Sequence, residues 1–222
     1  MSDNGEFAPM RASVLPLGDR ALLVRFGEVL DDAANCAALA LAAKLEDAPI
    51  AGVVEVVPSL ISVLLRYDPV TIDRHRLSGE IGLRLTGATQ TASARTYRLG
   101  VRFGGEAGPD LAEVAAALQL PESEFVARHC RQPLRVLTTG FAPGFVYCGF
   151  HTKALTVPRR MQVRPVVPAG SVLFAAGQTA IAATEVPTGW HVIGRTDFRN
   201  FDPTRSPPTT LAAGDRVQFE AV

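Results

Sequence analysis

The sequence is poor in cysteine and has no long apolar run. Its 222 residues include only three cysteines, Cys36, Cys130 and Cys148, which lie far apart and form no C-x-x-C pair. An odd and scattered set is typical of reduced thiols, so we interpret all three as packing residues. The longest apolar stretch, CAALALAA, has about eight residues, far short of the roughly 20 that a membrane helix needs. We therefore expect a cytoplasmic protein without a membrane segment.

The formal net charge of the chain is zero. Lys plus Arg and Asp plus Glu each number 22. Without an excess of positive charge, the chain has no field that would attract nucleic acid or an anionic membrane. We therefore expect its partners to be a small molecule and another protein.

Metal and nucleotide motifs are absent as well. The sequence has no H-E-x-x-H, no paired histidines and no acidic cluster, so we expect no metal site. The segment GGEAG at residues 104–108 precedes a predicted helix, where free N–H groups could seat an anion, but no Lys or Ser/Thr follows in P-loop spacing. Residues 1–12 contain acids and no apolar core, so we expect a disordered tail and no secretory signal.

Residues 13–85 predict a small α+β domain. Two short strands joined by a Gly-Asp turn come first, and apolar residues then recur at helical spacing for about four turns, with Asp31 or Asp32 placed to cap the helix. Pro49 ends this helix, and a strand pair and a short helix follow. The order strand, helix, strand, strand, helix is typical of a ferredoxin-like sandwich.

A polar segment separates this domain from the rest of the chain. Residues 86–96 are small and polar without apolar periodicity, so we predict a linker there and a second domain at 97–222. Asp110 and Glu113 have the spacing of a capping box, which predicts that the Asp110 carboxylate accepts N–H groups at the start of a helix. His129, at the end of a second short helix, would complement the helix dipole.

From Thr138 to Val222 the chain alternates short apolar runs with proline and glycine. The sequence has 16 prolines and 19 glycines, and in this stretch they separate apolar runs at nearly even spacing. This pattern predicts a compact antiparallel barrel rather than βαβ units. The predicted fold class is therefore an α+β domain followed by an all-β barrel with short helices.

Within the barrel, the segment GFAPGFVY predicts a rigid aromatic turn. Its glycines would let the main chain approach a ligand, and its rings would form apolar walls with one phenolic hydroxyl. The alternative, equally open, is a tight barrel corner whose rings pack in the core. The predicted substrate-binding residues of this turn are Gly140, Phe141, Pro143, Gly144, Phe145 and Tyr147.

Four arginines stand among the glycines and prolines of the barrel, where acids are few. Because a guanidinium fork suits carboxylate or phosphate, arginines that converge on one concavity would form an anion site. The alternative is that they pair with Asp197, Asp202 and turn carbonyls. We predict catalytic roles for three of them and substrate binding for the fourth; these are Arg159, Arg160 and Arg195, and then Arg164.

Three further polar residues complete the predicted site. Gln178 is an amide in an apolar run and would need a partner if buried, so we predict that it faces a pocket and has a catalytic role. His151 is the only base near the aromatic turn, and His191 follows Trp190 in a Gly-rich turn. We assign both histidines to substrate binding. The sequence shows no complete set of nucleophile and base.

An ordered set of motifs resembles a known family. In chain order these motifs are GF-x-PGF-x-Y, PRR, VPAGSV, GQT, GW-x-x-IGRT, FDP, PP and GDRV-x-F. They resemble the family of the 5-oxoprolinase B subunit, KipI and allophanate hydrolase subunit 1, a carboxyltransferase domain of subdomain C/D type. The segments GDRALLVRFG, GVVEVVPSLISVLLRYDP and GGEAGPDLAEVA also match, so the resemblance covers the chain from about Leu15.

This resemblance implies a cyclophilin-like barrel and a companion protein, called the C subunit, KipA or allophanate hydrolase subunit 2, and it leaves room for an A subunit. It implies an ATP-dependent enzyme that opens 5-oxoproline to glutamate, so ATP is expected on the resemblance alone. Two alternatives remain open. One is carboxyl transfer of the urea carboxylase type, with biotin delivered by another protein, and the other is inhibition of a histidine kinase.

The sequence departs from the family beside Gln178. Relatives commonly read GIYP after GQT and later SPGGW, whereas this chain has AIAA, with Ala182 and Ala183, and then VPTGW. A missing ring at this place would enlarge or reshape a pocket. The substrate of the best-known relatives is therefore not the only one expected.

Overall fold

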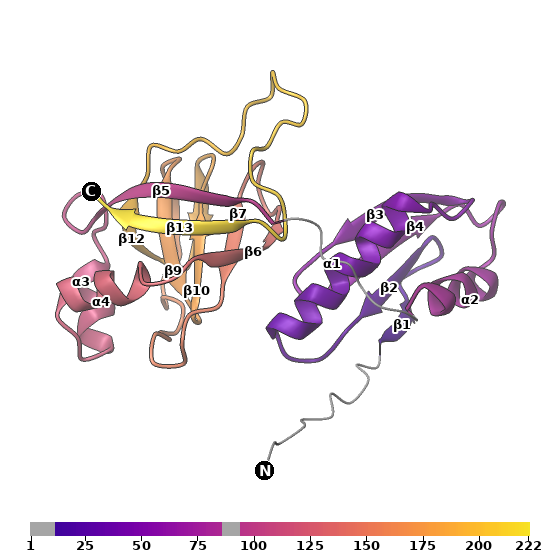
Figure 1. Ribbon diagram of the computed structural model, residues 1–222, viewed down its shortest axis with the longest axis horizontal. Helices are drawn as coiled ribbons and strands as arrows, with labels where there is room; N and C mark the ends of the chain where they lie inside the picture. The colour runs from indigo at the N-terminus through magenta and orange to yellow at the C-terminus, as the bar shows by residue number, and fades with distance from the viewer. Residues whose placement is uncertain (1–11, 86–93) are drawn as a thin grey trace, which may run out of the picture. The chain divides into compact units, whose positions relative to one another are not determined.

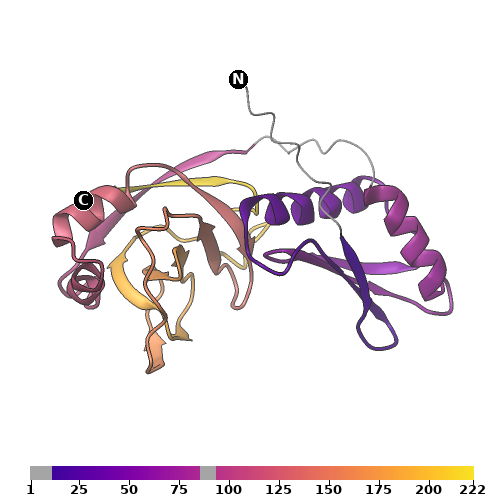
Figure 2. The same ribbon diagram turned by 90° about the horizontal axis from the view of Figure 1, so that it is seen from below.

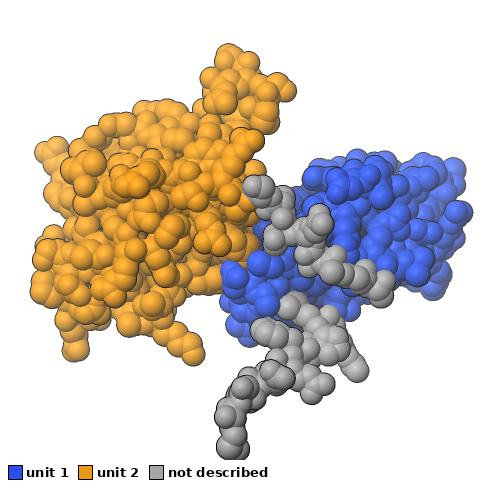
Figure 3. Space-filling model, viewed as in Figure 1, with its two compact units in different colours: residues 1–92 blue, residues 93–222 orange. Residues whose placement is uncertain are grey.

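The computed structural model describes residues 12–85 and 94–222 and divides the chain into two compact units, residues 1–92 and 93–222 (Figures 1 and 3). The predicted tail, except for its last residue, and most of the predicted linker lie outside the described residues. Each unit has its own hydrophobic core. In the described ranges no helix is both long and apolar enough to cross a bilayer.

Unit 1 is a four-stranded antiparallel sheet with two helices. The strand order is β1-β2-β4-β3, so β4 lies between β2 and β3, the two strands that α1 connects. α1 lies across one face of this sheet (Figure 2) and buries Ala38, Leu41 and Leu45 against it. The elements are β1 (Ser13–Pro16), β2 (Ala21–Arg25), α1 (Asp32–Asp47), β3 (Val53–Pro58), β4 (Ser62–Tyr67) and α2 (Arg74–Leu85).

The predicted ends of α1 are confirmed. The Asp31 carboxylate accepts the N–H of Ala34 at 2.8 Å, which satisfies one of the free donors of the first turn. The helix ends at Asp47, two residues before Pro49. The local signals at both ends were therefore sufficient to place this helix.

Unit 2 contains a closed barrel of seven strands in the order β10-β7-β6-β13-β5-β12-β9. β8 and β11 form a separate two-stranded sheet, and α3 and α4 follow β5. The elements are β5 (Thr96–Phe103), α3 (Leu111–Ala117), α4 (Glu122–His129), β6 (Leu134–Thr139), β7 (Val146–Gly149), β8 (Arg164–Val167), β9 (Ser171–Ala175), β10 (Gln178–Ile181), β11 (Val186–Thr188), β12 (His191–Arg195) and β13 (Arg216–Ala221).

The barrel is mixed, so the prediction of a purely antiparallel barrel is wrong at one pair. β5 and β13 run parallel, in register from Thr96 opposite Arg216 to Val101 opposite Ala221, whereas the other neighbouring pairs are antiparallel (Figure 1). β5 precedes the stretch from which the barrel was predicted. The alternation of apolar and polar residues along a strand shows which face of the strand is buried. It does not show which distant strand lies beside it.

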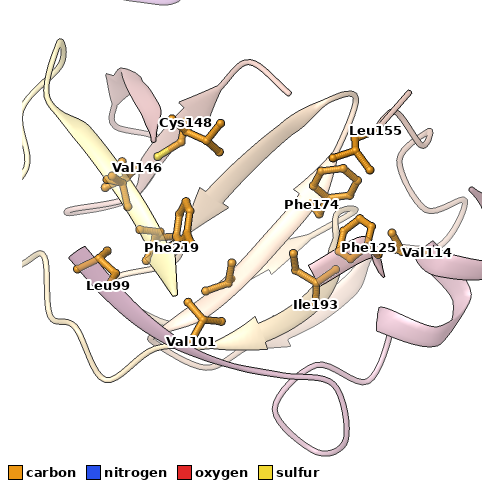
Figure 4. Packing of buried hydrophobic residues seen from close by; sticks show 14 of the residues in the cluster. Leu99, Val101, Val114, Phe125, Val146, Cys148, Leu155, Phe174, Ile193 and Phe219 are labelled. Carbon is orange, nitrogen blue, oxygen red and sulfur yellow. The ribbon is translucent and has the colours of Figure 1, made fainter. Parts of the chain in front are cut away.

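Strand β9 of the barrel is buried on both faces. Every residue of β9 is buried: Val172 and Phe174 belong to the core inside the barrel, whereas Leu173 and Ala175 belong to a second cluster outside it. Figure 4 shows the inner core, in which Phe125 of α4 meets Phe174 edge-on at 5.3 Å. A continuous apolar run is expected for a strand that is covered on both sides.

We call the second cluster the outer cluster. It packs the outer side of β7, β9 and β10 against the sheet of β8 and β11, and it contains Phe145, Val167, Leu173, Ala175, Ala180, Ala182, Val186, Trp190 and Val192. Cys148 points the other way, into the inner core, where it is fully buried as a packing residue (Figure 4).

Gly108 lies where a side chain would strike β12. A Cβ built on it would stand 2.1 Å from the carbonyl oxygen of Ile193. We expect Gly108→Ala to lower the free energy of unfolding by about 1–3 kcal/mol, because the main chain of β12 must move, as urea denaturation would measure. Gly79→Ala in α2 is the control, since nothing lies within 4 Å of its Cβ. It should be neutral or stabilising by up to ~1 kcal/mol, and equal losses in the two variants would contradict this packing.

Candidate functional site

Three segments of unit 2 meet at the carboxylate of Asp110, which is 4% exposed. Arg160 donates from Nη1 to Oδ1 at 2.7 Å, and Arg164 donates from Nη2 to Oδ1 at 2.7 Å and to Oδ2 at 3.0 Å. The main-chain N–H of Val192, on β12, donates to Oδ2 at 2.8 Å. The two arginines therefore share one buried carboxylate, which fixes the direction of both guanidinium groups.

The predicted capping box at Asp110 is wrong. Asp110 stands at the N-terminus of α3, but its side chain accepts no N–H from that helix, because the arginines and Val192 occupy its oxygens. Two N–H groups of the predicted anion seat at 104–108 are occupied as well. The N–H of Gly104 donates to Ile193 and that of Gly108 to Gly104, so neither is free.

Positive charge exceeds negative charge in this cluster. Two guanidinium groups face one buried carboxylate, and the next acid, Glu113, lies 3.4 Å from Arg160 Nη1 but is 64% exposed. The Nε atoms of Arg160 and Arg164 are buried and have no hydrogen-bond partner among the described residues. A buried donor without a partner is costly. These two N–H groups are therefore suited to an oxygen that the folded chain does not itself supply.

Gln178 and His191 also carry buried polar atoms without partners. Gln178 Nε2 and His191 Nδ1 have none within the described part of the chain. His191 Nε2 lies 3.1 Å from the carbonyl oxygen of Pro158, which can only accept, so Nε2 carries the proton and Nδ1 of the neutral ring is an acceptor. Four predicted residues thus offer three donors and one acceptor that the chain leaves unused.

Main-chain hydrogen bonds hold these residues in one region. The N–H of Arg160 donates to the carbonyl of Gly189 at 2.7 Å, which ties the arginine segment to the turn before His191. The N–H of Ala176, two residues before Gln178, donates to the carbonyl of Val157 at 2.7 Å. The structure therefore brings together the Gln178 turn, the arginine segment and the start of β12.

The aromatic corner is a row of ring contacts that ends at an arginine. Phe141, Phe145, Tyr147 and Trp190 contact one another in turn, with centroid separations of 5.4, 4.9 and 5.9 Å, and the Arg159 guanidinium lies 5.6 Å from the Trp190 centroid. Phe145 and Trp190 are buried, whereas Phe141 is 70% exposed. Burial raises the pKa of Tyr147, so its hydroxyl keeps its proton at neutral pH. The core-packing alternative thus holds for Phe145, and the role of Phe141 and Tyr147 as walls of a ligand site stays a prediction.

The two glycines of the aromatic corner are required for different structural reasons. A Cβ on Gly144 would stand 2.5 Å from Phe201 Cβ and 2.9 Å from Ala183 Cβ, so close packing requires this glycine. Gly140 has a φ of +129° and open space where its Cβ would be, which suits it to a turn, and Pro143 is exposed. The predicted role of Gly144 in ligand approach is therefore replaced by a packing role.

Arg195 does not join the Asp110 cluster. The predicted acid partners, Asp197 and Asp202, do not bind Arg160 or Arg164. Within the described residues, Arg195 forms no hydrogen bond or ion pair with the Asp110 cluster. Asp197 instead binds Arg102, at 2.8 and 2.9 Å. Asp202 accepts hydrogen bonds from the main chain and hydroxyl of Thr204. Spacing along the chain did not reveal Asp110 as the common partner, because about 50 residues separate it from the arginines.

His151 lies on the inner side of the barrel, beside His129, and not at the aromatic corner. The Nε2 atoms of both rings lie 2.8 Å from Thr179 Oγ1, and the ring centroids are 4.8 Å apart. Burial lowers the pKa of His151 to about 4, and that of His129 well below its ordinary value. A neutral His129 cannot complement a helix dipole by charge, so that prediction is wrong. Nowhere in residues 12–85 and 94–222 do three His, Cys, Asp or Glu side chains converge as metal ligands.

The family model of the carboxyltransferase domain, subdomain C and D, matches residues 12–211. The chain belongs to this family. It is 36% identical to the B subunit of 5-oxoprolinase from Bacillus subtilis strain 168, over 95% of this chain and 92% of that protein. The predicted family is thereby confirmed.

Solved structures share the fold of this carboxyltransferase-type chain. The chain is 36% identical in sequence to TTHA0988, and its structure matches the crystal structure of that protein with a TM-score of 0.80. The match covers 91% of this chain and 40% of TTHA0988. The chain thus spans less than half the length of TTHA0988. The urea amidolyase of Kluyveromyces lactis shares the fold, with a TM-score of 0.79 at 18% identity over 96% of this chain and 15% of that one.

The stability of this carboxyltransferase-type domain should depend strongly on Asp110. Asp110→Asn leaves two half-buried guanidinium groups facing a buried neutral amide, so we expect the free energy of unfolding to fall by about 3–5 kcal/mol. A mere helix cap would cost about 1 kcal/mol. Asp197→Asn breaks an ion pair that is largely exposed and is the matched control, for which we expect a much smaller loss. Similar urea midpoints for the two variants would refute the central role of Asp110.

The buried histidines should make stability fall in mild acid. The pKa of His151 is about 4 in the folded chain and 6.5 ordinarily. Between pH 4 and pH 6.5 the unfolded chain therefore binds a proton at this residue and the folded chain does not. Stability is therefore complete above pH 6.5 and is lost toward pH 4, by up to ~3 kcal/mol for this one group. Urea denaturation as a function of pH would measure the slope. His151→Gln should flatten it and exposed His75→Gln should not; unchanged slopes in both would contradict the assignment.

Proposed function

We propose that the chain is the B subunit of an ATP-dependent 5-oxoprolinase, which opens the cyclic amide 5-oxo-L-proline to L-glutamate. The similarity to the B subunit of the Bacillus subtilis enzyme covers nearly the full length of both chains, which supports a shared role. A subunit is by definition part of an assembly. The proposed partners are a companion C subunit, of the KipA or allophanate hydrolase subunit 2 type, and an A subunit, in the cytoplasm.

The observation that carries the chemistry is the set of buried polar atoms without partners. Arg160 Nε, Arg164 Nε and Gln178 Nε2 are donors, and His191 Nδ1 is an acceptor. 5-Oxoproline offers the complement: a carboxylate and an amide carbonyl accept, and an amide N–H donates. We assign the carboxylate to the two arginines, the carbonyl to Gln178 and the N–H to His191.

These residues would stabilise charge rather than attack the substrate. When the cyclic amide is opened, negative charge develops on the carbonyl oxygen, and a donor already held in a buried site lowers the energy of that state. ATP would activate the same carbonyl. Arg159 is exposed and held over Trp190, so it is available to a phosphate group of the nucleotide. Arg195 keeps its predicted catalytic role as a hypothesis, without support from the geometry.

A companion protein would complete the site. The segment between Arg160 and Arg164 turns its arginines toward Asp110 and its apolar side chains outward, with Met161 102% exposed and Val163 66% exposed. Phe141 of the aromatic corner is 70% exposed as well. Apolar side chains exposed beside a polar site are typical of a surface that another protein covers.

The finer fold assignments belong to the same proposal. A split βαβ unit is formed by β2, α1 and β3, with β4 lying between β2 and β3 in the sheet. This unit supports a ferredoxin-like assignment for unit 1. The additional strand β1 precedes it in the chain. The closed barrel supports a cyclophilin-like assignment for unit 2. The alternative function, carboxyl transfer with biotin delivered by another protein, has the family name and the fold of urea amidolyase in its favour.

Glutamate release by the coexpressed assembly tests the function. The chain with its companion proteins should release glutamate from 5-oxoproline only when ATP is present. Absence of this activity, together with copurification of a biotin carboxylase, would instead favour carboxyl transfer.

Gln178→Met tests the site within that assembly. Gln178 Nε2 makes no hydrogen bond in the folded chain, so its removal should leave stability unchanged while activity falls about 10–100-fold, equivalent to ~1.4–2.7 kcal/mol of transition-state stabilisation. Gln218→Met is the matched control, because the Gln218 amide donates to the carbonyls of Cys130 and Phe219. It should lower stability and leave turnover per folded enzyme unchanged. Full activity of Gln178→Met would refute the assigned role.

A further inference from the structure

Two imidazoles inside unit 2 share a single hydroxyl group. Thr179 Oγ1 lies 2.8 Å from Nε2 of His129 and 2.8 Å from Nε2 of His151. A hydroxyl has one proton, so it can donate to only one of the two rings, and the other ring must donate to it. Both rings are neutral near pH 7, because burial lowers both pKa values. The state of one ring therefore restricts the state of the other.

His151 connects this hydrogen-bonded pair to a cavity. The cavity has a volume of about 200 Å³ and is lined by Arg128, Arg131, Gln132, His151, Thr152 and Leu155. His151 Nε2 is occupied by Thr179, so Nδ1 is the ring nitrogen that remains for a ligand. Among the described residues this atom has no hydrogen-bond partner.

The polar lining of the cavity is cationic. Arg128 binds Glu124 at 2.6 Å, which neutralises much of its charge, whereas Arg131 is exposed and forms no ion pair with any described residue. Thr152 and Gln132 add neutral donors. The cavity therefore combines one free positive charge with several N–H and O–H groups.

Volume limits what can bind. Pockets for whole cofactors and drug-sized ligands span roughly 300–1,000 Å³, and this one is smaller, with room for one tetrahedral oxyanion. None of its lining residues belongs to the Asp110 cluster. We propose that this cavity binds a phosphate group, with Arg131 and Nδ1–H of His151 as its principal donors and Thr179 as a positioning residue.

Binding sets the order of protons along the hydrogen-bonded chain. An oxyanion accepts, so His151 must carry its proton on Nδ1 and accept at Nε2 from the Thr179 hydroxyl. Thr179 must then accept a hydrogen bond from Nε2–H of His129. This inference does not depend on the proposed function, because it involves no residue assigned to 5-oxoproline.

Phosphate titration followed by nitrogen NMR of the histidine rings tests the proposal on the full chain. Inorganic phosphate at constant ionic strength should move the His151 ring signals saturably toward the Nδ1–H form and move those of His129 toward Nε2–H, while His75 and His191 stay unchanged. Sodium chloride at the same ionic strength should have no such effect. Glycerol phosphate forms a second arm: equal saturation means that a phosphate ester is recognised, and no saturation means that free phosphate is the ligand.

Matched variants separate binding from folding. Arg131→Gln should raise the dissociation constant at least tenfold, whereas Arg199→Gln, also exposed, should not change it. Thr179→Val should weaken binding and Thr179→Ser should restore it. Shifts that do not saturate, that chloride reproduces, or that survive Arg131→Gln would overturn the proposal. If Thr179→Val does not fold, the histidine ring signals of the unmodified chain during the phosphate titration still test the proposal.

Discussion

The carboxylate of Asp110 joins three segments that the sequence separates. It binds Arg160, which stands before β8, and Arg164, the first residue of β8, as well as the main-chain N–H of Val192 on β12. Removal of this carboxylate would leave two guanidinium groups without their shared counter-ion, so the arrangement depends on Asp110 more than on either arginine. The arrangement thus fixes the segment that carries the outward-facing apolar residues and the unused donors.

Alternation along the strands explains why the barrel has two separate polar environments. Gln178 and Thr179 are consecutive residues of β10, yet Gln178 is paired with Ala175 of the outer cluster and Thr179 with Phe174 of the inner core. Consecutive side chains of a strand point to opposite faces. The glutamine therefore lies on the side of the outer cluster, and the threonine lies with the histidines His129 and His151.

Local signals predicted much of this fold. The cap at Asp31, the end of α1 before Pro49 and the short strands between prolines and glycines each depend on a few neighbouring residues, so composition and spacing were enough. The convergence of two arginines of the arginine segment was also predicted correctly. Their partner was not, because Asp110 has the local spacing of a helix cap and acquires its actual role only when distant segments meet.

The sequence by itself determined the periodicity of each element, the candidate polar residues and the family, because these are properties of nearby residues and of motif order. Only the tertiary structure decided that β5 closes the barrel parallel to β13, that Asp110 neutralises two arginines, and that His151 joins His129 through a hydroxyl group. Each of these contacts joins residues far apart in the chain. Their existence depends on the packing of the whole unit, and no local preference of the chain encodes it.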